Sequence, residues 1–317
     1  MTDSLAVDAV DVTKRYGDLV AVDAITVRVA QGEVYGVLGP NGAGKTTFLR
    51  MLFGLIAPDA GSIRLFGRSW KDAGPRTLDG VAGFIESPKF YPYLSARRNL
   101  VGLSVLDGGA PAGRIDEVLE IVDLSDRADD KVGGYSFGMR QRLGVAASLL
   151  RDPRLLVLDE PGNGLDPAGM RDMRALIARL AGSGLTVLLS SHDMVEVEEI
   201  CDNVTVMRAG RVAFHGGIAD LRAQAPEQGH RLATSDDPRA LSLSGGTRVQ
   251  EHPDGGLMVH GSQAEVDRYV AAVVGAGISL RALRLTEAPL EALFFMLTEA
   301  DAGPPATGPR PTAEVGA

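Results

Sequence analysis

The sequence VYGVLGPNGAGKTTFLRMLFGLI, residues 34–56, decides the fold. It opens with the apolar run VYGVLG, typical of a β-strand, and after Thr46 its apolar residues recur at helical spacing until Pro58. Between the two lies a glycine-rich turn, residues 39–46, which satisfies the pattern G-x-x-x-x-G-K-[ST] in full. Strand, glycine-rich turn and helix in this order predict an α/β unit that binds phosphate groups.

The residues of this turn have the chemistry that phosphates and a divalent cation require. Glycines let the backbone wrap closely round an anion, and the amides of residues 42–47 point their hydrogens at it from a helix N-terminus. In this pattern Lys45 reaches the β- and γ-phosphates, and the Thr46 hydroxyl ligates Mg²⁺. The residues expected to contact ATP here are Gly39, Pro40, Asn41, Gly42, Ala43, Gly44, Lys45, Thr46 and Thr47.

Two further apolar runs end in residues suited to hydrolysis. LLVLDE, residues 155–160, ends in adjacent carboxylates, of which Asp159 is suited to hold Mg²⁺ and Glu160 to orient and deprotonate the attacking water. His192 follows the run TVLLSS and is a candidate contact for the γ-phosphate. The alternative is structural, with the carboxylates capping the next helix and the histidine serving only to pack. The glycine-rich turn upstream favours the catalytic interpretation.

The arrangement of these patterns predicts one large α/β domain over residues 1–217. Residues 5–35 alternate apolar and polar positions, which is typical of a short antiparallel sheet. The continuous apolar runs at 155–159 and 186–191 indicate strands buried on both faces of a parallel sheet. Upstream of both runs, apolar stripes at helical spacing predict a helical subdomain at about residues 87–150.

The character of the sequence changes near Gly216 and Gly217. Short strand patterns then alternate with two helical patterns, which predicts a small α+β accessory or dimerisation domain over residues 218–300. The last stretch, residues 301–317, is rich in proline, glycine and alanine and is predicted to be a disordered tail.

Composition and charge bear on the partners and the compartment of the chain. The net charge is −9 and the sequence pI about 5.1, so the chain lacks the basic stripe that binds nucleic acid, and none is expected as a partner. A single cysteine, Cys201, cannot form an internal disulfide, which fits a reducing compartment. Since no apolar run approaches the ~20 residues of a membrane helix, we expect any membrane association to be through another protein.

Taken in order, the motifs resemble those of the ATP-binding subunit of an ABC transporter over roughly residues 5–217. They are KRYG, GPNGAGKTT, the stretch around Glu86, YSFGMRQR, LLVLDEP, GLDP and SSH. The resemblance implies a P-loop ATPase fold with an N-terminal antiparallel β subdomain and a helical subdomain. It also implies that two copies close head to tail over two ATP molecules and power a separate membrane permease.

The resemblance assigns roles to residues outside the glycine-rich turn. Tyr16 would stack its ring on adenine. Ser136 and Gly138 would clamp the γ-phosphate of the ATP bound by the other copy, and Asp166 would belong to the loop that couples the two sites. The family's usual Leu-Ser-Gly-Gly-Gln signature is Tyr-Ser-Phe-Gly-Met here, at residues 135–139. Because the serine and the second glycine remain, we expect a weakened clamp rather than a lost one.

Glu86 stands where the family normally has a glutamine that contacts Mg²⁺ and water and links the site to the permease. This glutamate within IESPKFYPYLSARRNL, together with YSFGMRQRL, resembles the branch of bacitracin, lantibiotic and related antibiotic-export ATPases. The resemblance implies antibiotic or drug efflux, with the chain held at the cytoplasmic face of the plasma membrane by its permease. An importer ATPase and a soluble ABC ATPase unconnected with transport are the alternatives.

The aromatic residues Phe90, Tyr91 and Tyr93 follow Glu86. In the resembled family this region forms the groove that receives a coupling helix of the permease, a role that rings with polar tips suit. The alternative is that the three rings pack inside the helical subdomain.

Overall fold

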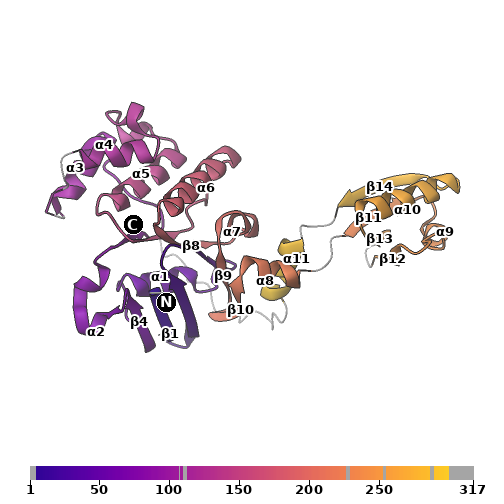
Figure 1. Cartoon of the computed structure of the whole chain (residues 1–317), viewed down its shortest axis with the longest axis horizontal. Coiled ribbons are helices and arrows are strands. Elements are labelled where there is room, and N and C mark those ends of the chain that lie inside the picture. The colour runs from indigo at the N-terminus through magenta and orange to yellow at the C-terminus, as the bar shows by residue number, and fades with distance from the viewer. Residues whose placement is uncertain are drawn as a thin grey trace, which may run out of the picture.

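The computed structural model describes residues 5–106, 108–109, 113–225, 229–252, 255–285 and 289–299. The predicted disordered tail, residues 301–317, lies outside the described residues. The strands of this part form three sheets (Figure 1). One is antiparallel, one is largely parallel, and one is a small antiparallel sheet towards the C-terminus.

The N-terminal sheet is antiparallel, as the alternation of residues 5–35 predicts. Its strands lie in the order β2-β1-β4-β5. Their bounds are β1 Leu5–Tyr16, β2 Leu19–Ala30, β4 Ala60–Leu65 and β5 Arg68–Ser69. Inward-facing residues such as Val7 and Ala9 are buried at alternate positions of β1, which leaves the residues between them nearer solvent.

The central sheet has the strand order β10-β9-β3-β8-β7-β6, and all neighbouring pairs are parallel except β10 with β9. Its strands are β3 Val34–Leu38, β6 Val81–Phe84, β7 Leu155–Asp159, β8 Thr186–Ser191, β9 Asn203–Arg208 and β10 Arg211–Gly217. Successive residues of β7 enter different cores, since Leu156 belongs to one and Val157 to the other. The continuous apolar runs therefore belong to strands covered on both faces, as predicted.

Helices lie on both faces of this sheet, since residues of α1 belong to one core and residues of α5, α6 and α7 to the other. The helices of this part of the chain are α1 Lys45–Leu52, α2 Trp70–Ala73, α3 Ala96–Leu106, α4 Arg114–Ile121, α5 Phe137–Leu149, α6 Pro167–Gly182 and α7 Met194–Ile200. Figure 1 shows α3, α4 and α5 gathered on one side, away from the N-terminal strands. This group belongs to the helical subdomain that was predicted at about residues 87–150, and the P-loop ATPase fold with its antiparallel and helical subdomains is confirmed.

A small α+β unit stands apart from the rest in Figure 1. It contains a sheet of order β12-β13-β11-β14 and two helices around a separate apolar core. Its elements are β11 Gly229–Thr234, α9 Asp237–Leu241, β12 Arg248–Glu251, β13 Leu257–His260, α10 Gln263–Gly275 and β14 Leu280–Leu285.

The helices that flank this unit in the chain pack elsewhere. Apolar residues of α8 (Ile218–Gln224) and α11 (Pro289–Glu299) join the core on one face of the central sheet, with Leu221 and Leu293 among them. Helix α11 contacts α7, α8, β9 and β10. Residues 218–300 were expected to form one accessory domain, but the helices at both ends of that range pack on the ATPase core instead.

Candidate active site

The candidate site lies where adjacent parallel strands of the central sheet end. Strands β3, β8 and β7 are neighbours, and their last residues are in register: Leu38 pairs with Ser191 and Asp159 with Ser190. The glycine-rich turn follows β3, Glu160 follows β7 and His192 follows β8. Parallel strands leave their carboxyl ends at one edge of a sheet, where ligands of open α/β sheets bind. The order of the strands therefore gathers all three segments.

The glycine-rich turn has backbone conformations and close contacts that only glycine accommodates well. Gly42 and Gly44 have φ values of 83° and 102°, in the left-handed region that glycine favours. At Gly39 a Cβ atom would lie 2.4 Å from the carbonyl oxygen of Met207, so no side chain fits there. Among the described residues, α1 has no side-chain cap at its N-terminus, which leaves its first amides as donors for an anion.

The turn lines a cavity of about 490 Å³. Residues 41–47 all line it, as does Tyr16, a residue that is 47% exposed and whose ring centroid lies 5.6 Å from Lys14 Nζ. Gly39 and Pro40, which were expected to contact ATP directly, use their carbonyl oxygens to accept hydrogen bonds from Lys45 Nζ at 2.7 and 3.2 Å.

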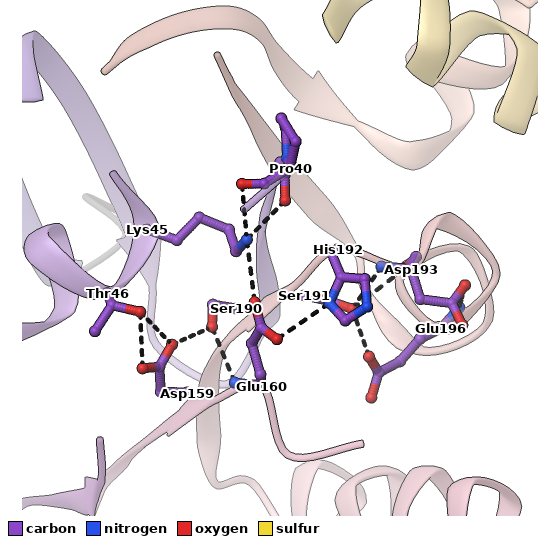
Figure 2. A network of polar contacts seen from close by, with 11 residues as sticks. Pro40, Lys45, Thr46, Asp159, Glu160, Ser190, Ser191, His192, Asp193 and Glu196 are labelled. Atoms are coloured by element: carbon purple, nitrogen blue, oxygen red, sulfur yellow. Dashed lines mark hydrogen bonds and ion pairs between the residues drawn. The ribbon is translucent and has the colours of Figure 1, made fainter. Parts of the chain in front are cut away.

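Lys45 and Glu160 form an ion pair in this cavity. The Lys45 side chain is only 4% exposed, and its Nζ lies 3.1 Å from Glu160 Oε1. The other oxygen of that carboxylate, Oε2, lies 3.1 Å from His192 Nδ1 (Figure 2). A single carboxylate thus sits between the residue predicted to hold phosphate and the histidine predicted to contact it.

The backbone at Glu160 explains how two adjacent carboxylates reach one place. Neighbours on a strand point to opposite faces. Glu160 has φ 47°, a left-handed conformation that is uncommon for a residue with a side chain. This turn of the chain directs its carboxylate to Lys45, whereas that of Asp159 accepts a hydrogen bond from the Thr46 hydroxyl at 3.0 Å.

The oxygen atoms beside Thr46 fit Mg²⁺. This hard cation prefers carboxylate and hydroxyl oxygens, and it is usually bound by one or two carboxylates together with phosphates and water. Thr46, Glu86, Asp159 and Glu160 line a second cavity of about 370 Å³. Within the described ranges no three or more histidine, cysteine or acidic residues gather into an all-protein metal cage.

Glu86 reaches this cavity but has a partner outside it. Its carboxylate forms an ion pair with the Arg50 guanidinium of α1, and its side chain is 64% exposed. Glu86 also has a left-handed backbone, with φ 63°. The structure thus brings the predicted metal residue near Thr46 and Asp159 while directing its charge to Arg50.

Two buried serines and a buried glutamate close to the predicted residues in the chain were not identified from the sequence. Ser190 donates from Oγ to Asp159 Oδ1 at 2.6 Å and accepts from the Glu160 amide at 3.0 Å. Ser191 donates to Glu196 Oε2 at 2.6 Å. Burial raises the pKa of the Glu196 carboxyl, and the Ser191 hydrogen bond opposes this rise. The signal in the sequence that could have identified them is the pair of polar residues, Ser190 and Ser191, at the end of an otherwise apolar run before His192.

The residues implied to act on a second ATP molecule line a different cavity from the one that Lys45 lines. Ser136, Gly138 and Asp166 line a separate cavity of about 400 Å³. Ser136 accepts a hydrogen bond from Met139 N at 3.2 Å and caps α5. Asp166 accepts from Gly169 N at 2.8 Å and caps α6. Within one chain these three residues share a cavity with one another, and Phe137 and Gly164 line both this cavity and the one beside Thr46.

The aromatic residues after Glu86 divide between the two interpretations. Tyr91 and Tyr93 are 62% and 65% exposed, with ring centroids 5.7 Å apart. Phe90 is partly buried against the core and lines a groove together with Leu103 and Leu106 of α3. The two tyrosines therefore lie on the surface, whereas the phenylalanine packs within the fold.

Comparisons with known proteins identify a family and relatives for this chain. Residues 22–163 match the family model described as ABC transporter. The bacitracin transport ATP-binding protein BcrA of Bacillus licheniformis is 37% identical over 93% of this chain and 97% of its own. The daunorubicin resistance ATP-binding protein DrrA3 of Streptomyces coeruleorubidus is 42% identical over 67% of this chain and 68% of its own.

A solved structure agrees with the fold as well. That of cbiO1 from Clostridium perfringens, described as part of the ABC transporter complex cbiONQ, superposes with a TM-score of 0.64 and 26% identity. The superposition covers 70% of this chain and 92% of that one. In the part of the chain that the structure describes, no helix combines the length and the apolar character needed to span a bilayer.

Proposed function

The chain belongs to the ABC transporter family as an ATP-binding subunit that couples ATP hydrolysis to transport, and we propose that the transport it powers is export of an antibiotic or drug-like compound through a separate permease. Two relatives support the proposed cargo, one named for bacitracin transport and the other for daunorubicin resistance. Similarity to the bacitracin protein extends over nearly the whole of both chains, including the small α+β unit.

The observation that carries the proposed chemistry is the position of Glu160 between Lys45 and His192. A carboxylate at the edge of a cavity that can hold phosphates is placed to orient a water molecule and take its proton. Lys45 would bind phosphate oxygens together with the first amides of α1, and His192 would hold the water and the γ-phosphate in line. Thr46 and Asp159 would hold Mg²⁺, which when bound neutralises charge on phosphate oxygens.

We further propose that two copies of the chain complete each site. Ser136 and Gly138 present a helix N-terminus at a cavity that is separate from the glycine-rich turn. A second copy arranged head to tail would bring this cavity to the γ-phosphate, as the family resemblance implies. Asp166, which lines the same cavity, would then lie between the two sites. Glu86, Tyr91 and Tyr93 would report the nucleotide state to the permease.

The variant Glu160→Gln tests the proposed base. Hydrolysis should fall about 10²-fold or more, because the amide cannot accept the proton, whereas ATP binding should persist. Turnover by colorimetric phosphate release and ATP affinity by fluorescent-nucleotide binding would be measured side by side. Glu117→Gln, at an exposed position of α4, is the matched control and should retain wild-type turnover. Unchanged turnover in Glu160→Gln would remove Glu160 from the mechanism.

The proposed partner and direction need a cellular experiment. The tagged chain would be purified from gently solubilised native membranes, and stoichiometric partners identified by mass spectrometry. A polytopic membrane protein is expected, and its loss in a folded Tyr91→Ala/Tyr93→Ala variant would place the contact at these rings. Deleting the gene should then sensitise cells to the exported antibiotic. Recovery of ribosomes or repair proteins without a permease would favour the soluble alternative, and reduced nutrient uptake the importer.

A further inference from the structure

We propose that Ser190 is a positioning residue for ATP hydrolysis, whose hydroxyl orients the Asp159 carboxylate and holds the backbone turn that directs Glu160 to Lys45. This inference rests on the proposed function of the site and deepens it. Its subject is a serine that lies behind both carboxylates rather than in the cavity itself.

The geometry at Ser190 is specific to these two neighbours. Ser190 is fully buried near the end of β8 and is paired in register with Asp159 of β7. Its Oγ donates to Asp159 Oδ1 at 2.6 Å and accepts from the Glu160 amide at 3.0 Å. Figure 2 shows both bonds meeting at the one hydroxyl. The Ser190 hydroxyl thus donates to Asp159 and accepts from Glu160, two consecutive residues with different proposed roles.

The first task is to orient Asp159. Thr46 Oγ1 lies 3.0 Å from Asp159 Oδ2, and Ser190 bonds the other oxygen, Oδ1. A carboxylate bonded at both oxygens cannot rotate freely about its χ2 angle. Groups that hydrogen-bond a metal-ligating residue fix its orientation, and their removal weakens metal binding. The Ser190 hydroxyl therefore holds Asp159 in one orientation before a cation arrives.

The second task is to hold Glu160 in its left-handed conformation. With φ 47° this residue adopts a backbone that side chains disfavour, and the conformation persists only where surrounding contacts enforce it. The bond from the Glu160 amide to Ser190 is such a contact. Without the hydroxyl the amide would lose its acceptor, and the chain would be free to relax toward an extended conformation. The Glu160 carboxylate would then leave its position 3.1 Å from Lys45 Nζ.

The alternative is that Ser190 has only a packing role between the strands. A filler residue would tolerate alanine with some loss of stability and no change in the chemistry of the site. The two interpretations therefore differ in one measurable respect, which is whether the response to Mg²⁺ changes separately from the stability of the protein.

The test compares Ser190→Ala with Ser190→Thr in the full chain. For each protein, the melting temperature would be measured in ATP with EDTA, and again in ATP with increasing Mg²⁺, and kcat would be measured separately. In Ser190→Ala the Mg²⁺ concentration that gives half of the Mg²⁺-dependent rise in melting temperature should increase about tenfold, and kcat should fall about tenfold or more. The rise in melting temperature that ATP causes in the presence of EDTA should persist. Ser190→Thr, which restores the hydroxyl, should recover most of both the Mg²⁺ response and kcat.

Thr186→Val is the matched control in the same strand. Thr186 is buried in β8 and its hydroxyl accepts a hydrogen bond from Gly32 N at 2.9 Å, remote from the carboxylates. This variant should melt at a lower temperature and keep the wild-type Mg²⁺ midpoint. If Ser190→Ala does not fold, Ser190→Cys, a small side chain with a weak donor, should show an intermediate rise in the midpoint.

Each outcome decides the matter. A Ser190 variant that melts earlier but keeps the wild-type Mg²⁺ midpoint and kcat would overturn the inference and leave the proposed function intact. A wild-type protein that shows neither an Mg²⁺-dependent shift nor hydrolysis would overturn both. A raised midpoint in Ser190→Ala or Ser190→Cys, with a normal midpoint in Thr186→Val, supports the positioning role.

Discussion

The parallel sheet and the small antiparallel sheet of this chain place polar groups very differently. Strands β3, β8 and β7 run in one direction, so their ends deliver Lys45, Glu160 and His192 to one edge. In the sheet of β11–β14 every neighbour runs the opposite way, and consecutive strand ends fall at opposite edges. Parallel pairing therefore concentrates side chains from distant segments, which antiparallel pairing disperses.

The buried residues of the two units reflect this difference. Behind the parallel strand ends lie Asp159, Ser190, Ser191 and Glu196, each bonded to another polar group. In the described part of the small unit the core cluster is apolar, and buried polar groups include the Tyr269 hydroxyl, which donates to Ala240 O at 2.9 Å, and the Thr234 hydroxyl, which donates to Asp237 Oδ1 at 2.7 Å. Substitutions near the active site should thus change chemistry, whereas those in the small unit should change stability.

The largest expected effect is that of Lys45→Ala. Removing the buried ammonium takes away a phosphate donor and leaves Glu160 without its cation, so ATP affinity should fall about 10²-fold or more and hydrolysis should be lost. Equilibrium binding of a fluorescent nucleotide measures this. Lys71→Ala, at an exposed position of α2, is the control. If hydrogen exchange in residues 229–285 of Lys45→Ala also rose sharply, a substitution at the active site would have changed the stability of the small unit, against the expected contrast.

A smaller effect, confined to the other unit, is expected of Leu232→Ala. Leu232 is fully buried in the small apolar core, and truncating such a leucine costs about 2–4 kcal/mol. Hydrogen exchange measured by mass spectrometry should rise within residues 229–285 while ATP affinity stays at its wild-type value. Leu280→Ala, on the exposed part of β14, serves as the control. A matching loss of ATP affinity would show that the small unit acts on the active site.

The smallest effect expected is a pH-dependent gain in stability from Glu196→Gln. Because burial raises the pKa of Glu196, its stabilising contribution is present below the unfolded pKa and is lost as pH rises through the folded value. Glutamine stays neutral and can still accept from Ser191. Thermal unfolding at about pH 8 should therefore show a gain of about 1 kcal/mol or less, shrinking toward about pH 5. A gain that grows on acidification would contradict this sign.

The sequence by itself determined the residues that local patterns specify. Lys45, Thr46, Asp159 and Glu160 follow from a strand, a glycine-rich turn and a second apolar run, because these patterns depend on residues adjacent in the chain. The presence of a helical subdomain and of a small α+β unit followed in the same way from periodicity. His192 was identified because it comes directly after a buried strand.

Only the tertiary structure decided which distant residues support that site. Ser190 meets Asp159 and Glu160 across 31 and 30 residues of sequence, and Arg50 pairs with Glu86 across 36. Helices α8 and α11 likewise join the ATPase core although they flank the small unit in sequence. Such contacts depend on the order β3-β8-β7 and on single backbone conformations such as that of Glu160. Periodicity along the chain specifies neither the strand order nor such a conformation. It reports only which face of its own strand or helix a residue occupies.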